Sequence, residues 1–146
     1  MKRLSKINQV VSVRLAAAAL LGCNLLTANA QSLDNFDPNA NGVVHVVLVQ
    51  PDGKILLGGD FTALAPNGGS EVTRNHIARL NADGTLDSDF IVNANGTVRA
   101  IALQSDGKII VGGDFAVING QPRSRLARLA GSNGAADSFA PDCIIQ

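Results

Sequence analysis

The sequence carries one twelve-residue phrase twice, QPDGKILLGGDF at residues 50–61 and QSDGKIIVGGDF at residues 104–115. The two copies begin 54 residues apart. Self-similarity at a fixed period of this size is typical of folds that stack copies of one structural unit. The phrase therefore determines the general architecture, and the rest of each unit can be read outward from it.

Each copy of the phrase predicts a β-hairpin. An apolar run rich in β-branched residues precedes it, at 43–49 and 97–103, and such residues fit a pleated strand better than a helix. A Pro-Asp-Gly or Ser-Asp-Gly turn follows, and then a second short apolar strand at 54–57 and 108–111. From the alternation in the run at 97–103, we expect one face to hold Val98, Ala100 and Ala102, and the other Arg99, Ile101 and Leu103.

A pair of glycines ends each hairpin, Gly58-Gly59 and Gly112-Gly113. Glycine in a strand usually marks a bulge or a close approach of two backbones, which is the interpretation we adopt. A phosphate-binding loop is excluded because no Lys-Ser/Thr pair follows. The letters GGDF also resemble the signature of diguanylate cyclases, but the second acidic residue of that match is absent and the string occurs twice in a short repeat.

The remainder of each unit predicts two more strands. Alternation at 75–80, repeated at 124–129, indicates a third strand, and an Asp-Gly turn leads into a short fourth strand at 85–86. Between the hairpin and the third strand, residues 62–73 are rich in Pro, Gly and Ser and are expected to form an exposed loop, about five residues longer than its counterpart at 116–122. The sequence therefore predicts an all-β protein of two tandem four-stranded antiparallel units.

Side chains that recur at equivalent positions are expected to stabilise each unit. The only aromatic residues all lie at repeat-equivalent places and predict core packing between stacked sheets, although a stacking platform for a ligand is the alternative. These are Phe36, Phe61, Phe90, Phe115 and Phe139. The recurring charges predict an ion pair within each unit or a bidentate cap on backbone carbonyls, with an anion site as the alternative. They are Arg79 and Arg128, and Asp60 and Asp114.

Neither catalytic, cofactor-binding nor metal-binding residues are predicted. Residues 37–42 match the first half of an EF-hand loop, but its twelfth position is Leu48 instead of Glu, so a turn is expected. Asp83, Asp87 and Asp89 gather around one turn and could hold a weakly bound cation, but the next unit has Asn133 in place of Asp83. His45 and His76 are each replaced by arginine in the second unit, so no repeated imidazole is present to bind a metal ion or transfer protons. The variable loop 62–73 holds Glu71 as its single acid.

The first 30 residues predict a secretory signal peptide. A basic start precedes an apolar stretch at 15–21, and Ala28-Asn29-Ala30 is a small-x-small cleavage site. The alternative is a bacterial lipobox around Leu20-Leu21-Gly22-Cys23, in which cleavage before Cys23 would leave a lipidated terminus. Cleavage after Ala30 removes Cys23 and leaves Cys143 without an intrachain partner. Both alternatives place the protein outside the cytoplasm, whether secreted, periplasmic or at the cell surface.

Composition excludes several classes of partner. A formal net charge of 0 with 16% charged residues provides no basic surface for nucleic acid. The apolar leader is too short to predict a transmembrane helix, and nothing after residue 30 is amphipathic enough to predict membrane binding.

The order of these elements resembles the delta-60 repeat family, whose tandem units are thought to form β-propeller blades. The resemblance rests on Leu86-Asp87…Phe90, on the phrase at 106–115 and on Ala78-Arg79-Leu80-Asn81…Asp83-Gly84, and it covers about residues 33–139. It implies an exported bacterial protein and brings no catalytic residues. The expected organisation is a signal peptide at 1–30, a first repeat at 31–86, a second at 87–136 and the start of a third at 137–146.

Propellers close with about four to eight blades, so two units predict a fragment of a longer protein, two sheets facing each other, or a ring completed by oligomerisation. The end of the sequence within a third unit favours the fragment. Unpaired strand edges and apolar faces would then favour self-association. The predicted function is a non-enzymatic extracellular scaffold that binds a protein or a glycan. The alternative is a glycan-binding module, or a secreted hydrolase or lyase that uses Asp60 and Asp114.

Overall fold

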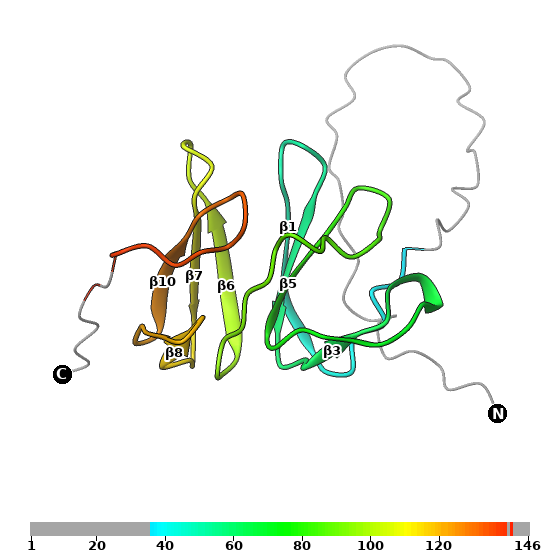
Figure 1. The fold of residues 1–146 in the computed structure, drawn as a ribbon, viewed down its shortest axis with the longest axis horizontal. Helices are drawn as coiled ribbons and strands as arrows, with labels where there is room; N and C mark the ends of the chain where they lie inside the picture. Colours follow the sequence, from blue (N-terminus) through cyan, green and yellow to red (C-terminus); the bar gives the residue numbers. More distant parts are fainter. Residues whose placement is uncertain (1–35, 140, 142–146) are drawn as a thin grey trace, which may run out of the picture. The chain divides into compact units, whose positions relative to one another are not determined.

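The computed structural model describes residues 36–139 and 141, and the predicted signal peptide lies outside this range. Two three-stranded antiparallel sheets, each accompanied by a two-stranded ribbon, form the framework of the described part. The first sheet has the order β1-β2-β5, from strands Val44–Val49, Ile55–Gly59 and Ile77–Leu80. The second sheet has the order β6-β7-β10, from strands Val98–Leu103, Ile109–Gly113 and Leu126–Leu129. The two sheets stand side by side in Figure 1 and repeat one topology, which confirms the all-β prediction.

A fourth strand is present in each unit as a single bridge. Leu86 bridges Leu80 in the first unit, and Ala136 bridges Leu129 in the second. Backbone hydrogen bonds extend the first bridge, because the amide of Asp87 donates to the carbonyl of Arg79 at 2.9 Å. The outer strand of each sheet therefore pairs at one point with the chain that follows it.

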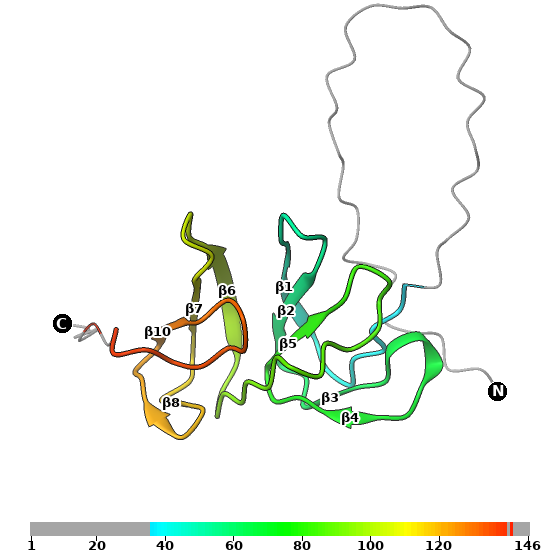
Figure 2. The same ribbon diagram turned by 45° about the horizontal axis from the view of Figure 1, so that its top comes forward.

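The segment expected to be an exposed loop is partly buried. It contains β3 (Ala63–Leu64), a single 3-10 turn at Pro66–Gly68 and β4 (Val72–Thr73), and β3 pairs with β4. Leu64 is fully buried, because Phe61 and β3 fold back under the first sheet and cover its apolar side chains. The second unit repeats this two-stranded ribbon with β8 (Val117–Ile118) and β9 (Gln121–Pro122), and Figure 2 shows β3–β4 and β8 at the same end of their sheets.

A β-bulge changes which side chains of β6 share a face. Val98 pairs with Gly113 and Ala100 pairs with Gly112, so Arg99 is the extra residue on its strand. After the bulge the alternation shifts by one place: Ile101 and Leu103 join Val98 in the core, whereas Ala100 and Ala102 are exposed. The predicted alternation of this strand is therefore wrong. His45 is the corresponding bulged residue in β1.

The second glycine of each pair is required by the bulge. A Cβ on Gly59 would lie 2.0 Å from the carbonyl oxygen of Val43, and one on Gly113 would lie 2.0 Å from that of Thr97. Each of these carbonyls accepts a hydrogen bond of 2.8 Å from the following aspartate amide, so it cannot move away. The predicted bulge and close backbone approach are both confirmed.

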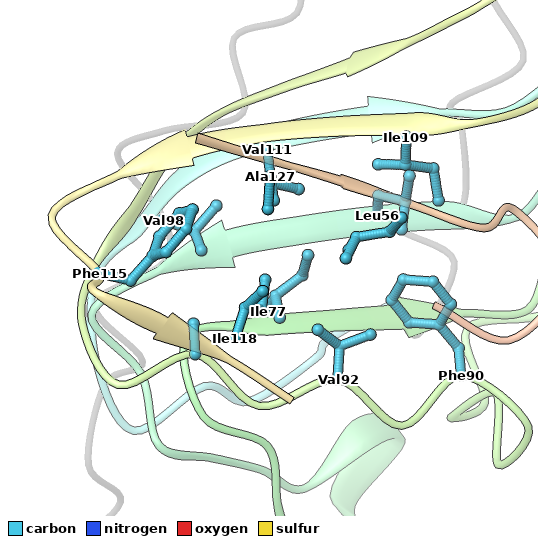
Figure 3. Packing of buried hydrophobic residues seen from close by; sticks show 12 residues of the cluster. Leu56, Ile77, Phe90, Val92, Val98, Ile109, Val111, Phe115, Ile118 and Ala127 are labelled. Carbon is cyan, nitrogen blue, oxygen red and sulfur yellow. The ribbon is translucent and has the colours of Figure 1, made fainter. Parts of the chain in front are cut away.

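The main core lies between the two sheets. Leu56 and Ile77 of the first sheet pack among Val98, Ile109 and Val111 of the second, all fully buried (Figure 3). A smaller core lies on the opposite face of the first sheet, beneath the β3–β4 ribbon. Phe61, Phe90 and Phe115 are buried in these cores, as predicted, and Phe139 is half-buried. The prediction of a core position is wrong for Phe36, which is 37% exposed, because no described arginine covers its ring as Arg79 covers that of Phe90.

Candidate functional site: repeated charges at the joint between the sheets

Asp60 ends the first hairpin and lies where the two units meet. Its carboxylate accepts a 2.5 Å hydrogen bond from the hydroxyl of Thr97, the residue before β6, and lies 2.8 Å from Nε2 of His45. The bulge in β1 directs the His45 side chain toward this carboxylate, since it removes that residue from the strand's alternation. The hydrogen bond from Thr97, followed by that with His45, lowers the pKa of Asp60.

Asp114 occupies the equivalent position in the second unit and binds the other bulged residue. Nε and Nη2 of Arg99 lie 2.7 and 2.6 Å from its Oδ2. This hydrogen bonding lowers the pKa of Asp114 and raises that of Arg99. Both side chains are about half exposed. The bulged residue and the aspartate of the GGDF phrase therefore form a repeated pair, His–Asp in one unit and Arg–Asp in the other.

Arg79 connects the first unit to the second. Its Nε donates to Asp87 at 2.8 Å, while Nη1 and Nη2 donate to the backbone carbonyls of Gly131 and Ser132, the latter at 2.7 Å. The guanidinium also lies over the ring of Phe90, 4.4 Å from its centroid. Only 3% of the Arg79 side chain is exposed. We call this arrangement the Arg79 clamp.

Asp87 is the anionic centre of the clamp. Nζ of Lys54 lies 2.7 Å from the same Oδ2 that receives Arg79. Burial favours a higher pKa for Asp87, but the hydrogen bonds from Lys54, from the backbone of Asp89 and from Arg79 outweigh it, so the pKa is lowered. The carboxylate is thus ionised and held by two cations.

The second unit repeats this arrangement with more exposure. Nε of Arg128 donates to Asp137 at 2.6 Å, and its guanidinium lies 4.8 Å from the ring centroid of Phe139. Arg123 donates to the carbonyl of Asp137 at 2.5 Å. The backbone amide of Phe139 is the main cause of a lowered Asp137 pKa. About a quarter of the Arg128 side chain is exposed, in contrast to Arg79.

These contacts support the structural interpretation of the recurring charges and correct its details. A bidentate cap on backbone carbonyls was predicted and is confirmed at Arg79, but it crosses from one unit to the next. Arg79 does not pair with Asp60, because Asp87, eight residues later, lies opposite it. Asp60 pairs instead with the bulged His45. The alternative anion site would have to form where each of these cations already binds a carboxylate.

The acidic turns considered as cation sites are stabilised by their own backbone. Asp37 accepts a 2.8 Å hydrogen bond from the amide of Asn39, and Asp83 accepts one of 2.9 Å from the amide of Thr85 together with the threonine hydroxyl at 2.6 Å. The hydroxyl and the amide of Thr85 lower the pKa of Asp83. Within residues 36–139, no set of three His, Cys, Asp or Glu side chains is placed to bind a metal ion.

A groove between the two hairpin turns was not found by sequence reasoning. It has a volume of about 560 Å³, and its walls come from equivalent residues of the two units. Gln50 and Pro51 face Gln104 and Ser105 across it. Gln50 is 8% exposed, and its Oε1 has no hydrogen-bond partner among the described residues. The signal that could have found this groove is the repeat itself, since glutamine begins both copies of the phrase.

The described part of the chain contains no helix that is both long and apolar enough to cross a lipid bilayer. Residues 50–90 and 104–139, just over half of the chain, match the family described as "Domain of unknown function (DUF5122) beta-propeller". The chain belongs to this family. In this DUF5122 β-propeller, the matched segments begin at the turn of each hairpin and contain β2 and β5 of the first sheet and β7 and β10 of the second, with the Arg79–Asp87 and Arg128–Asp137 pairs. The two sheets are therefore its blades. No curated protein and no solved structure matches the chain.

Proposed function

We propose that this chain is an exported, non-enzymatic repeat protein of the delta-60 type that acts as a scaffold outside the cytoplasm. The observation that carries the proposal is the role of its repeated charges. Asp60, Asp87, Asp114 and Asp137 each bind a cationic or imidazole side chain of the blade framework. Two of these sites also contact the neighbouring blade, Asp60 directly through Thr97 and Asp87 through its partner Arg79. The lowered pKa of each carboxylate makes it a poor general acid near neutral pH.

The partner of such a scaffold is a protein or a glycan. Two surfaces support this proposal: the turn groove with the buried Gln50 Oε1, an acceptor for a hydroxyl or amide donor, and the ribbon of β3 and β4, which is the longest difference between the blades. The scaffold would need no cofactor, would not bind nucleic acid and would have no membrane span. If processing occurs before Cys23, a lipid anchor would hold it at the membrane surface.

Export can be tested by expressing the chain with its own leader in a bacterial host and measuring the mass of the processed protein. An N-terminus at Gln31 in the periplasm or medium supports secretion. A membrane-bound product that begins with a lipidated Cys23 supports the anchored form. Full-length protein that stays in the cytoplasm would contradict export in both forms.

The alternative, a hydrolase or lyase that uses the blade face, predicts that Asp60 and Asp114 are required for turnover. Both are about half exposed, so Asp60→Asn/Asp114→Asn is expected to fold, which circular dichroism checks. The control is Asp89→Asn, an exposed acid outside the turn groove. A panel of polysaccharides is then assayed for binding and for newly formed reducing or unsaturated ends.

The scaffold proposal expects the wild-type chain to release no new ends, whether or not it binds a polysaccharide. Release of ends that is lost in Asp60→Asn/Asp114→Asn and retained in the control would overturn it in favour of catalysis.

A further inference from the structure

The joint between the two blades has two different halves. The first blade contributes the face of its sheet that carries Val46, Leu48, Leu56 and Ile77. The second blade contributes the opposite face of its own sheet, with Val98, Ile101, Leu103, Ile109 and Val111. The joint is therefore heterologous: the surface on one partner is not the surface on the other. Each blade also has the half that it does not use in the joint.

The unused half of the first blade is partly covered by the β3–β4 ribbon, which buries its β2 and β5 side chains, but its β1 side is exposed and apolar. Its Val47 and Val49 are the repeat counterparts of Ile101 and Leu103, and they are 46% and 65% exposed. Val43 is the counterpart of Thr97 and is 56% exposed, and Phe36, the counterpart of the fully buried Phe90, is 37% exposed. Of the five large apolar side chains that are exposed in the described chain, four therefore occupy joint positions; Ile91 is the fifth.

The unused half of the second blade has the complementary positions. Ala100 and Ala102 are the counterparts of Val46 and Leu48, and both are exposed. Gly112 shows that this face is uncovered. A Cβ on Gly112 would meet nothing closer than 3.7 Å, whereas one on its counterpart Gly58 would lie 2.6 Å from Val98 of the neighbouring blade.

We propose that these two unused faces bind each other between copies of this chain: the Val47–Val49 face of one copy packs on the Ala100–Ala102 face of the next. The contact repeats the internal joint in trans. Because it is heterologous, the same contact can recur at each free face, so association continues beyond a dimer until a ring closes. The internal joint specifies the orientation, since it shows which face of one blade fits which face of the next.

Polar groups at the second face agree with this orientation. Arg128 is the counterpart of Arg79, and within the described residues its side chain donates only to Asp137, through Nε. In the internal joint, Nη1 and Nη2 of Arg79 donate to carbonyls of the turn that follows β10. The counterpart turn of an incoming copy is 81–84, which we expect Arg128 to bind. Phe139 already occupies the place under Arg128, so the incoming copy does not need to supply Phe36.

The internal joint also indicates that association is weaker than the contact between blades. Ala100 and Ala102 are smaller than Val46 and Leu48, and Val47 and Val49 are smaller than Ile101 and Leu103. Less apolar area is then buried in trans than in cis, and the hydrophobic contribution scales with that area. A reversible, concentration-dependent equilibrium is the expected behaviour.

The test uses sedimentation velocity on the full chain and three single variants over a concentration series. Val49→Asp places a charge on the first face, and Ala102→Asp places one on the second. Ile91→Asp is the matched control, because Ile91 is 58% exposed, close to the 65% of Val49, and is not a joint position. The wild-type chain and Ile91→Asp are expected to associate, and each face variant alone to be weakened by about tenfold or more, since a desolvated charge would lie in the contact.

Mixing the two face variants gives the decisive result. Val49→Asp retains an intact second face and Ala102→Asp an intact first face, so an equimolar mixture is expected to form one-to-one heterodimers and nothing larger. The proposal is overturned by a wild-type chain that stays monomeric up to about millimolar concentration, where a specific contact should be populated. It is also overturned if the mixture behaves like the separate variants, or if Ile91→Asp disrupts association as strongly as they do. The inference rests on the blade faces alone, so its failure leaves the proposed scaffold function and export untouched.

Discussion

Substituting alanine for the two neighbouring glycines at the end of β7 should produce opposite effects on stability. A Cβ on Gly113 would lie 2.0 Å from the carbonyl oxygen of Thr97 and 3.0 Å from its carbon, whereas one on Gly112 would meet nothing closer than 3.7 Å. Neither residue has a positive φ, so the comparison measures space and not backbone conformation. The two positions share one strand and one change of side chain.

The magnitude follows from what the Thr97 carbonyl does. Gly113→Ala must displace it by about 1 Å or more to reach ordinary contact, which breaks or distorts its 2.8 Å hydrogen bond from the amide of Asp114. Losing that bond costs about 1 kcal/mol, and overpacking adds about 1–3 kcal/mol. We therefore expect Gly113→Ala to lower the free energy of unfolding by about 2–4 kcal/mol. Gly112→Ala should be neutral or stabilising by about 0.5 kcal/mol, because alanine loses less backbone entropy in a strand.

Thermal unfolding followed by far-ultraviolet circular dichroism measures both changes, since the chain has no tryptophan or tyrosine for fluorescence. At about 4 °C per kcal/mol for a domain of this size, Gly113→Ala should lower Tm by about 8–16 °C. The melts are recorded at the lowest usable concentration, so that contacts between copies do not contribute. Equal Tm values for the two variants would refute the steric argument, and Gly59→Ala provides an independent repeat of the prediction in the first blade, where the carbonyl of Val43 is equally close.

Three further predictions concern the charges and the aromatic residues. Arg79→Ala should lower the free energy of unfolding by about 3 kcal/mol or more, because it breaks a buried ion pair and two contacts with the next blade. Arg128→Ala, at the more exposed counterpart, should lower it clearly less. Equal losses of stability in urea unfolding would contradict this prediction. Phe90→Ala should cost about 3–5 kcal/mol, and Phe36→Ala much less because its ring is 37% exposed; similar Tm values for the two variants would count against this assignment of the core. The pKa of Asp87 is lower in the folded chain than in the unfolded chain, so ionised Asp87 stabilises the fold fully above the unfolded pKa of about 4, and this stabilisation is lost as the pH falls through the folded value. Thermal melts from neutral to strongly acidic pH should show this loss. An Asp87→Asn variant that loses stability equally steeply would contradict it.

The repeated hairpins could be predicted because their information is local. The Asp-Gly turns, the β-branched runs and the glycine pairs each require a particular backbone, and the structure contains it at both copies. The faces of β6 could not be predicted, because one extra residue at Arg99 reverses the alternation of every later side chain. Nothing in the letters TVRAIAL places the bulge at that residue.

The contacts of the charged residues depended on distant partners. Arg79 binds carbonyls at 131 and 132, and these belong to a turn whose position follows only from the packing of the two blades. The recurrence of Arg79 and Arg128 did indicate a structural role, and the choice of carbonyl partners was correct in kind. Gln50 and Arg74 also have repeat counterparts in Gln104 and Arg123. The burial of Gln50 and Arg74, and the contact of Arg123 with Asp137, appear only in three dimensions.

The bulges at His45 and Arg99 have a consequence for how such repeats can diversify. A residue outside the regular alternation can change its chemistry while the strand, its register and its neighbours stay the same, and the two blades already differ there by an imidazole and a guanidinium opposite a common aspartate. A tandem array would then display one variable side chain per blade at a constant spacing and orientation. Protein engineers could use this position to install a ring of chosen side chains without redesigning any sheet.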